Sequence, residues 1–251
     1  MNSWARRRKL VYVIAVTIIL IGAVGVPIFF TVYEAPTCFD GVKNGKEKDV
    51  DCGGACEKLC SSSFLPPQVT WTRYEEIAPG IYNMAAYIVN PNTDAEARNV
   101  PYRMVMYDKN GVPVAEIDGK VDIPPHRNTL AFQSSIDVNE SVPVSRTFEF
   151  TGIPEWTKKS DPLASITYER GKYEEGSAGS SYMVLLKNSN ILPVSNVTVF
   201  VILKDVEQNV IGFSKTIIEE IPAKGSAVAP FTWPLSRYGR VNSTEVLIVT
   251  E

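Results

Sequence analysis

The hydrophobic and polar residues of this chain follow two patterns, one near the N-terminus and one in the remainder. Residues 10–32 form an apolar run without a charged residue, and Arg6, Arg7, Arg8 and Lys9 precede it. Twenty-three helical residues at about 1.5 Å each reach roughly 34 Å, enough to cross a hydrocarbon core of about 30 Å. The pattern therefore predicts an uncleaved transmembrane helix that anchors the protein in the cell membrane.

A cleaved signal peptide is the alternative for this segment. Signal h-regions usually span about 7–15 residues and end at an A-x-A-like site. The apolar run here is longer, and Tyr33-Glu34-Ala35 is a poor cleavage site. Because positive charge stays in the cytoplasm, the basic tail predicts a single-pass protein with a cytoplasmic N-terminus and extracytoplasmic residues 33–251.

After residue 65 the pattern becomes that of β-strands. Short runs rich in β-branched and aromatic residues, such as MAAYIVNP and VPYRMVMYD, end in Asn, Pro, Gly or Asp. Strands bounded by turns have this composition, and no segment in this region shows sustained helical periodicity. The sequence predicts a mainly β protein built of antiparallel β-sandwiches.

The β region repeats at a spacing of about 97 residues. VTWTRYEE at Val69 matches ITYERGKYEE at Ile166, and DIPPHRNT at Asp122 matches EIPAKGSA at Glu220. A repeat of this length is a whole domain, so we expect two tandem immunoglobulin-like sandwiches of roughly 100 residues each. The predicted parts are a cytoplasmic tail (1–9), the membrane helix (10–32), a cysteine-rich stalk (33–60), a linker (61–68) and the sandwiches (69–158 and 159–251).

One hairpin of each repeat carries a signature before its turn. Tyr107 and Asp108 end a strand in the first repeat, and Leu203 and Asp205 lie at the matching end of a strand in the second. This pattern resembles the FxLYD family of small immunoglobulin-like envelope domains, which implies a sandwich fold and a place in the cell envelope. The Asp side chain can close the turn through backbone hydrogen bonds, which gives it a structural role.

All four cysteines lie in one stretch, CFDGVKNGKEKDVDCGGACEKLC, at Cys38, Cys52, Cys56 and Cys60. Outside a cell, an even number of cysteines usually forms disulfides, and three connectivities are open. Two disulfides would hold a segment too short to build a core. The alternatives are a zinc site and reactive thiols. Zinc modules use C-x2–4-C pairs separated by a longer loop, whereas three cysteines here crowd into nine residues.

Oxygen donors alternate with glycines in the same stretch. They are Asp40, Asn44, Glu47, Asp49 and Asp51. Calcium takes six to eight oxygen ligands, so calcium is the one cofactor that the sequence suggests, and a solvated turn region is the alternative. The stretch also resembles a cysteine motif of secreted and surface proteins, CxDGxxNG…DCGGxC, which implies an extracellular module rather than a chemistry.

The net charge and the motifs of the chain limit the classes of partner and of activity that we expect. Without the basic tail, 21 basic side chains face 28 acidic ones, a net charge of −7, which disfavours nucleic acid and an anionic lipid surface as partners of the exported part. The single histidine, His126, has no nucleophile pattern beside it, and G-x-S-x-G, P-loop and H-E-x-x-H motifs are absent.

We therefore expect no enzyme and no small-molecule substrate. The expected function is a binding or assembly module with a protein partner in the envelope. The alternatives are a stalk with a metal-linked structural role and a carbohydrate-active ectodomain.

Two further expectations concern packing. Adjacent residues of a strand face opposite sides, so we expect the acidic neighbours Glu75 and Glu76 to lie on solvated turns and edges. Trp156 lies at the junction of the repeats, and we expect it to pack the two sandwiches together.

Overall fold

The computed structural model describes residues 3–32, 35–139, 141–159, 163–176, 179–234 and 240–250. The chain divides into two units, Met1–Cys56 and Glu57–Glu251. Tyr33 and Glu34, at the alternative cleavage site, lie outside the described residues.

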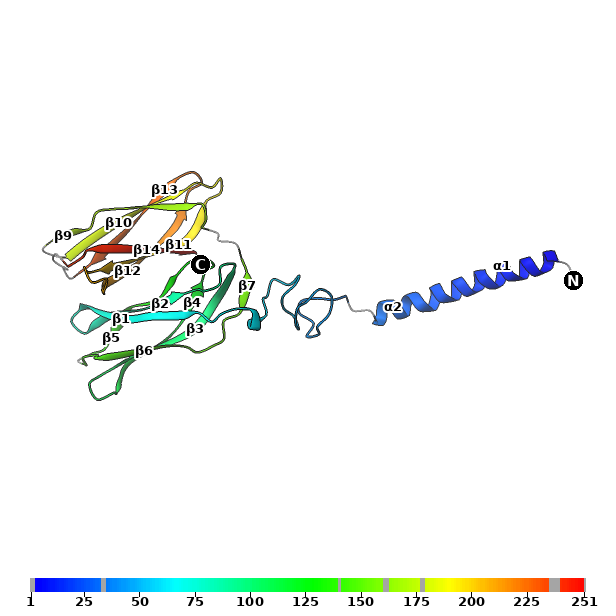
Figure 1. Cartoon of the computed structure of the whole chain (residues 1–251), viewed down its shortest axis with the longest axis horizontal. Helices are drawn as coiled ribbons and strands as arrows, with labels where there is room; N and C mark the ends of the chain where they lie inside the picture. The colour runs from blue at the N-terminus through cyan, green and yellow to red at the C-terminus, as the bar shows by residue number, and fades with distance from the viewer. Residues whose placement is uncertain are drawn as a thin grey trace. The chain divides into compact units, whose positions relative to one another are not determined.

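The first unit begins with the apolar helix (Figure 1). Helix α1 (Ser3–Leu20) continues through a π-helical turn, η1 (Ile21–Gly25), into α2 (Val26–Val32). Pro27, two residues after the π turn, has no backbone N–H to donate, which explains a break in the hydrogen-bond ladder near this point. The segment Arg6–Phe29 has a mean hydropathy of 2.6 and no buried residue, so by length and composition it fits a membrane anchor or a signal sequence.

The second unit contains a short 3-10 helix, η2 (Ser61–Ser63), and fourteen described strands. The strands of the first sandwich are β1 (Gln68–Ala78), β2 (Ile81–Val89), β3 (Ala95–Tyr107), β4 (Pro113–Ile123), β5 (Thr129–Asp137), β6 (Ser145–Phe150) and β7 (Trp156–Lys158). The strands of the second are β8 (Ile166–Arg170), β9 (Glu174–Gly176), β10 (Gly179–Asn188), β11 (Val194–Lys204), β12 (Val210–Ile221), β13 (Ser226–Trp233) and β14 (Ser243–Thr250). The predicted fold class is confirmed.

The two sandwiches have the same strand order. In the first, sheet β1-β2-β5 faces sheet β4-β3-β6, and β7 also pairs with β3. In the second, sheet β8-β10-β13 faces sheet β12-β11-β14, and β9 also pairs with β10. All of these pairings are antiparallel.

Each sandwich has its own hydrophobic core between its two sheets. Met84 and Met104 are fully buried in the first core, and Val184 and Val199 are fully buried in the second. Strand β10 alternates between buried and more exposed residues, as expected of a strand with one covered face. The hydrophobic pattern thus places one face of each sheet in a core.

The turn after β3 is closed by Asp108. Its Oδ1 accepts the backbone N–H of Asn110 and of Val112, both at 2.8 Å. The hydrogen bond from Val112 lowers the pKa of this carboxyl because it stabilises the charged form. Asp205 makes the corresponding bonds after β11, to the N–H groups two and four residues further on, at 2.9 and 2.8 Å.

The residues before these aspartates differ in burial. Leu203 is fully buried in the second core, whereas Tyr107 is partly exposed and its hydroxyl lies 3.4 Å from Thr147 Oγ1. His126 and Lys224 both lie at turns with left-handed backbone, with φ of 56° and 52°. A matching backbone at both positions shows that they serve as equivalent turns.

Candidate functional site

Two disulfides hold the cysteine segment, as predicted. Cys38 is bonded to Cys56, with their Cα atoms 5.7 Å apart. Cys52 and Cys60 are also disulfide-bonded and no cysteine is free, which leaves them as the second pair. The structure thereby gives the connectivity that the spacing left open. No thiolate remains for the alternatives of a zinc site or a reactive thiol.

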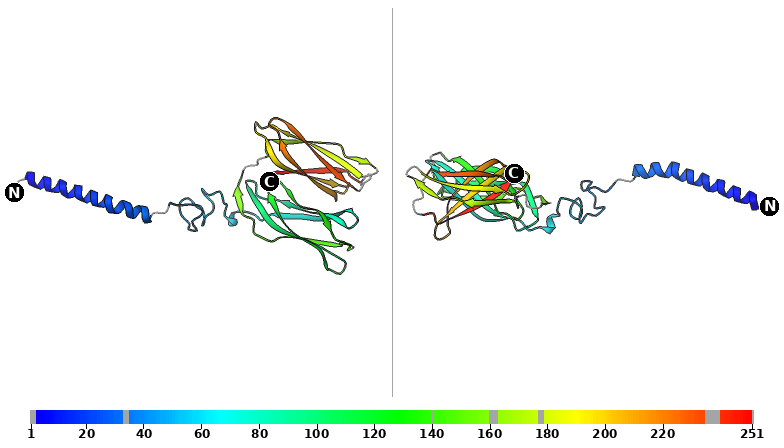
Figure 2. Two further views of the ribbon diagram at one scale, coloured as in Figure 1. Left: turned by 180° about the vertical axis from the view of Figure 1, so that it is seen from behind. Right: turned by 90° about the horizontal axis from the view of Figure 1, so that it is seen from above.

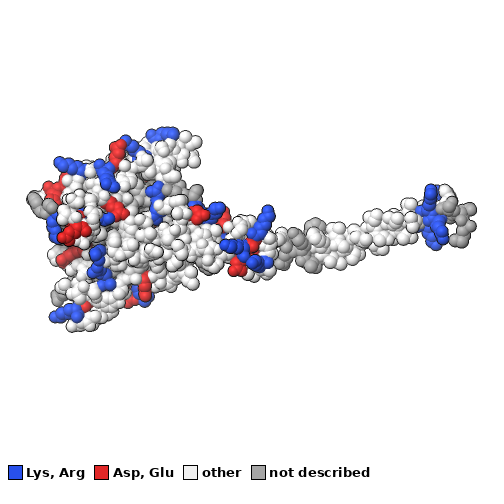
Figure 3. Space-filling view, viewed as in Figure 1, with Lys and Arg blue, Asp and Glu red and all other residues white. Residues whose placement is uncertain are grey.

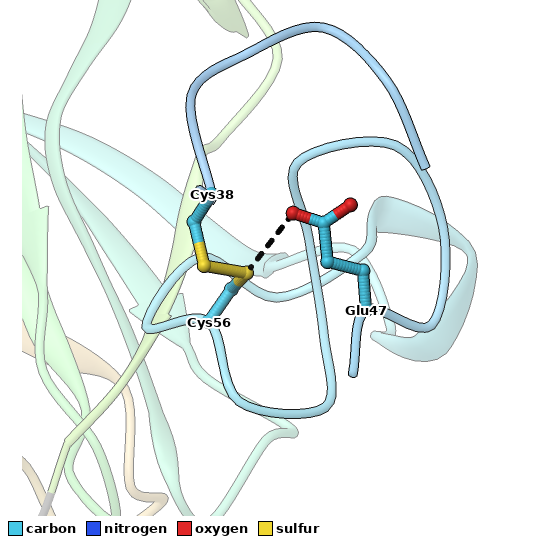
Figure 4. A group of neighbouring side chains, drawn as sticks. All are labelled: Cys38, Glu47 and Cys56. Atoms are coloured by element: carbon cyan, nitrogen blue, oxygen red, sulfur yellow. Dashed lines mark hydrogen bonds between the residues drawn. A yellow bond between two sulfur atoms is a disulfide. The ribbon is translucent and has the colours of Figure 1, made fainter. Parts of the chain in front are cut away.

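Glu47 lies beside the first disulfide (Figure 4). The possible ligand atoms of Cys38, Glu47 and Cys56 are within 4.8 Å of one another. Glu47 Oε1 is 3.5 Å from Cys56 Sγ, a contact only, because a disulfide sulfur has no hydrogen to donate. Its Oε2 accepts the N–H groups of Asn44 at 3.2 Å and Asp51 at 3.4 Å, so the carboxylate holds two parts of the loop together beside the disulfide.

The other candidate calcium ligands also bind backbone groups. Asp40 accepts the N–H groups of residues 37 and 42 at 3.0 Å and the Nδ2–H of Asn44 at 2.8 Å. The bond from Asn44, followed by the backbone bonds, lowers the pKa of Asp40. Both oxygens of Asp51 accept the N–H of Gly41, and Asp49 accepts that of the next residue at 2.9 Å.

These carboxylates do not converge on one point. In the part of the chain that the structure describes, the only grouping of three or more possible metal ligands is Cys38, Glu47 and Cys56. Calcium binding by the five oxygen donors stays a prediction. Gly54 in this module has a φ of +63°, and a Cβ there would collide with the carbonyl oxygen of Lys46, which explains the glycine of the DCGG sequence.

The segment after the module attaches to the first sandwich. Leu59 N–H donates to Trp156 O at 2.8 Å, and Lys158 N–H donates to Glu57 O at 3.0 Å. Phe64 stacks on Trp156 with ring centroids 6.2 Å apart. The prediction that Trp156 packs between the sandwiches is wrong, because pairing of β7 with β3 turns its side chain into the first core.

The two sandwiches instead meet through one sheet of each. The outer face of sheet β1-β2-β5 packs against the outer face of sheet β12-β11-β14 (Figures 1 and 2). The buried residues of this interface are Ala85, Tyr87, Leu130, Phe200, Ile202, Phe213, Leu247 and Val249, with Trp71, Val89, Phe132 and Val210 packed against them. These two sheets are therefore covered on both faces.

A hydrogen bond crosses the same interface, and polar contacts within each sandwich hold its two partners. The Tyr87 hydroxyl donates to Glu245 Oε1 at 2.7 Å and accepts a hydrogen bond from Asn128 Nδ2 at 2.8 Å. Burial, and then the bond to Glu245, raises the pKa of Tyr87, so the hydroxyl keeps its proton for this bond. Lys204 Nζ, on β11 of the same sandwich as Glu245, pairs with Glu245 Oε2 at 2.7 Å. This ion pair and the bond from Asn128 hold the two partners of the Tyr87–Glu245 hydrogen bond in place.

Glu75 is a buried carboxylate at this interface. It is 8% exposed, and its Oε1 accepts the backbone N–H of Phe213 at 3.4 Å. The expectation that it lies on a solvated edge is wrong, because the second sandwich covers that face of β1. Its neighbour Glu76 is exposed, as expected.

A groove of about 400 Å³ opens at the rim of the interface, with lining residues from both sandwiches. Its apolar floor includes Phe132 and Leu130 from the first sandwich and Phe200 from the second. Four consecutive residues of β5, 129–132, line it, and β5 is an edge strand of its sheet. An edge strand carries backbone groups that can pair with another chain.

The charge of the groove is opposite to that of the exported part of the chain. Of the residues that the structure describes, Arg98, Lys120 and Lys215 line it together with a single carboxylate, that of Asp122. Arg98 pairs with Glu96 at 3.0 Å, and Lys215 Nζ lies 5.7 Å from the centre of the Phe132 ring. Within the described ranges, neither Lys120 nor Lys215 forms an ion pair. Two cations of the groove are thus free to meet an acidic partner.

None of the predicted site residues lies in this groove. The cysteines, the oxygen donors and the basic tail are at the N-terminal side of the chain, and the turn signature is in the hairpins of the sandwiches. A usable signal did exist: β2 and β11 are nearly continuous apolar runs. Strands buried on both faces have this pattern, whereas strands at the outside of a sandwich alternate.

Comparisons with known proteins give this chain no family. No protein-family model matches it, and no curated protein sequence does. The crystal structure of red sea bream transglutaminase is similar at 12% identity with a TM-score of 0.25, over 74% of this chain and 31% of the transglutaminase chain. A likeness at this level carries no argument about activity.

Proposed function

We propose that this protein is a membrane-anchored binding module of the cell envelope. Its two immunoglobulin-like sandwiches form one body that binds a protein partner in the groove between them. The observation that carries the proposal is the groove itself, with an apolar floor, an edge strand and the free cations Lys120 and Lys215. Ligand sites occur preferentially at domain interfaces, and edge strands and charged grooves bind extended segments of other proteins.

A binding role has more support than catalysis. Among the described residues, Asp122 is the one carboxylate that lines the groove, and its Oδ1 accepts the backbone N–H of Asn99 at 2.7 Å. Glycoside hydrolysis usually requires two carboxylates that flank a substrate. The groove lining contains no histidine or cysteine that could act as a base or nucleophile.

The proposed location rests on the helix and on the charges at its end. Figure 3 shows basic side chains gathered at the N-terminal end of the helix and no charge along the rest of it. In the proposed topology these cations stay in the cytoplasm, and the cysteine module and the sandwiches are outside. The resemblance to FxLYD domains supports a place in the envelope.

Reversal of the four basic residues tests this topology. We expect Arg6→Glu, Arg7→Glu, Arg8→Glu and Lys9→Glu together to prevent export of the sandwiches, because the positive charge that retains the N-terminus is lost. Labelling of intact cells with a membrane-impermeant amine reagent would measure how many lysines of the sandwiches lie outside the membrane. A variant that exchanges Arg for Lys and Lys for Arg at these positions is the control. Unchanged labelling of the reversed variant would contradict the topology.

The binding proposal is tested by reversing the charge of the groove. We expect Lys120→Glu with Lys215→Glu to reduce capture of the envelope partner at least about tenfold, because two favourable charge contacts become repulsive. Capture is measured by short-range cross-linking in cells, purification of the tagged full-length protein and quantitative mass spectrometry.

The matched control is Lys109→Glu with Lys172→Glu, which changes the charge equally at two exposed positions outside the groove. A partner that binds in the groove is retained by the native protein and the control and lost by the groove variant. The same set of proteins captured by all three would refute the groove as the binding site.

A further inference from the structure

We propose that the cysteine module has a lipid-contacting tip, Phe39 with Val42, that rests in the interfacial region of the bilayer. This inference goes beyond the binding groove and rests only on the membrane-spanning role assigned to the helix. It assigns the module a second attachment to the membrane, in addition to the covalent link to the helix.

The first observation is the exposure of these side chains. Phe39 is 89% exposed and Val42 is 60% exposed, on a module in which the cysteines at 52 and 56 are buried. An apolar aromatic side chain left in water is unfavourable, and here it is the most exposed large hydrophobic residue that the structure describes. A lipid interface would remove this surface from water.

The second observation is that the tip is braced. Cys38, next to Phe39, is bonded to Cys56, and Asp40 and Asp51 accept the N–H groups of Val42 and Gly41. These bonds hold the loop in a fixed shape with its apolar side chains outward. A loop that only needed to be soluble would gain nothing from presenting phenylalanine on a rigid support.

The third observation identifies lipid as the occupant. Helix α2 ends at Val32, and seven residues later comes Phe39. An extended chain covers at most about 3.6 Å per residue, so Phe39 is tethered within roughly 25 Å of the helix end. That distance includes the headgroup region, where aromatic side chains are favoured.

Two exposed lysines of the module can contact phospholipid headgroups. Lys43 and Lys46 are exposed on the same module, and the carboxylates of Asp40, Glu47 and Asp51 accept hydrogen bonds from the backbone of the loop. Exposed ammonium groups on a module tethered close to the bilayer can reach lipid phosphates. The acidic charge of the exported part as a whole does not oppose this local contact, because salt limits the range of its electrostatic repulsion to about one Debye length.

Photo-cross-linking in native membranes tests the proposal. The full-length protein is produced with p-benzoylphenylalanine at position 39, at position 18 within the helix, or at position 206, an exposed valine of the second sandwich. After irradiation, the mass of the purified protein distinguishes lipid adducts from protein adducts. We expect lipid adducts at positions 18 and 39 and none at 206. A companion variant has the probe at position 42 with Phe39→Asp, and we expect its lipid adducts to fall severalfold relative to the same probe beside Phe39.

The outcomes separate this proposal from the anchor on which it rests. Absence of lipid adducts at position 18 would refute the membrane-spanning helix. Adducts at position 18 together with protein adducts, or no adducts, at position 39 would overturn the lipid-contacting tip and leave the anchor intact. An unchanged intact mass after alkylation, with no free thiol, shows that the variants keep both disulfides.

Discussion

Replacing Phe213 by alanine is expected to lower the free energy of unfolding of the paired sandwiches by about 3–5 kcal/mol. Phe213 is 1% exposed at the interface, and its ring centroid lies 5.9 Å from that of Phe132 and 6.3 Å from that of Trp71. Alanine would leave a cavity that the two rigid sheets cannot close. The same variant loosens the position of the backbone N–H that Glu75 accepts.

Denaturant unfolding of the full-length protein in detergent measures this effect. The control is Ile217→Ala on the same strand, β12, where the side chain is 51% exposed, so the expected change is within about 0.5 kcal/mol. We also expect Phe213→Ala to separate the unfolding of the two sandwiches into two transitions. A loss below about 1 kcal/mol would contradict the packed interface.

Removal of the Cys38–Cys56 disulfide is expected to unfold the cysteine module while the sandwiches stay folded. The bond closes a loop with a sequence separation of 18, and a loop of that size contributes about 3 kcal/mol in the chain-entropy description. The module has few buried residues besides its cysteines, so little else offsets the loss. Trypsin cleavage after Lys43, Lys46 or Lys48 should then accelerate by about a hundredfold, because cleavage follows the open population.

The variant for this experiment is Cys38→Ser with Cys56→Ser, in which the other two cysteines can pair only with each other. Ala55→Ser is the control, because it introduces serine at an exposed position of the same loop. Equal cleavage rates in variant and control would show that the disulfide does not determine the stability of the module. Intact fragments that contain both sandwiches would confirm that the effect is local.

Much of the fold could be predicted from the periodicity and composition of the sequence. The apolar helix, the antiparallel strands and the disulfides were predictable because each depends on local composition and spacing. Asp108 and Asp205 could also be assigned to turns, since an aspartate bonds to backbone groups two and four residues away without help from the rest of the chain. Leu203 is buried and Tyr107 is partly exposed because they hold different positions, two residues before Asp205 and one residue before Asp108.

The candidate site was not predictable in the same way. Glu75 was expected in solvent, but the second sandwich covers it. Trp156 was expected between the sandwiches, but it packs in the core of the first. The continuous apolar runs of β2 and β11 did indicate strands covered on both faces. They could not indicate that the other sandwich covers the outer face of each strand. A run of apolar residues shows that a strand is buried but does not show what buries it.

By itself, the sequence determined the membrane-compatible helix, the mainly β fold and the pairing of all cysteines in disulfides, since these depend on interactions between residues close along the chain or on composition. The tertiary structure decided the disulfide connectivity, the burial of Glu75 and the groove that Lys120 and Lys215 both line. The burial of Glu75 and the groove bring together residues about 95 or more positions apart, and only the packing of one sheet on another does this. The connectivity depends on how the cysteine loop folds, because four cysteines allow three pairings and their spacing does not choose among them.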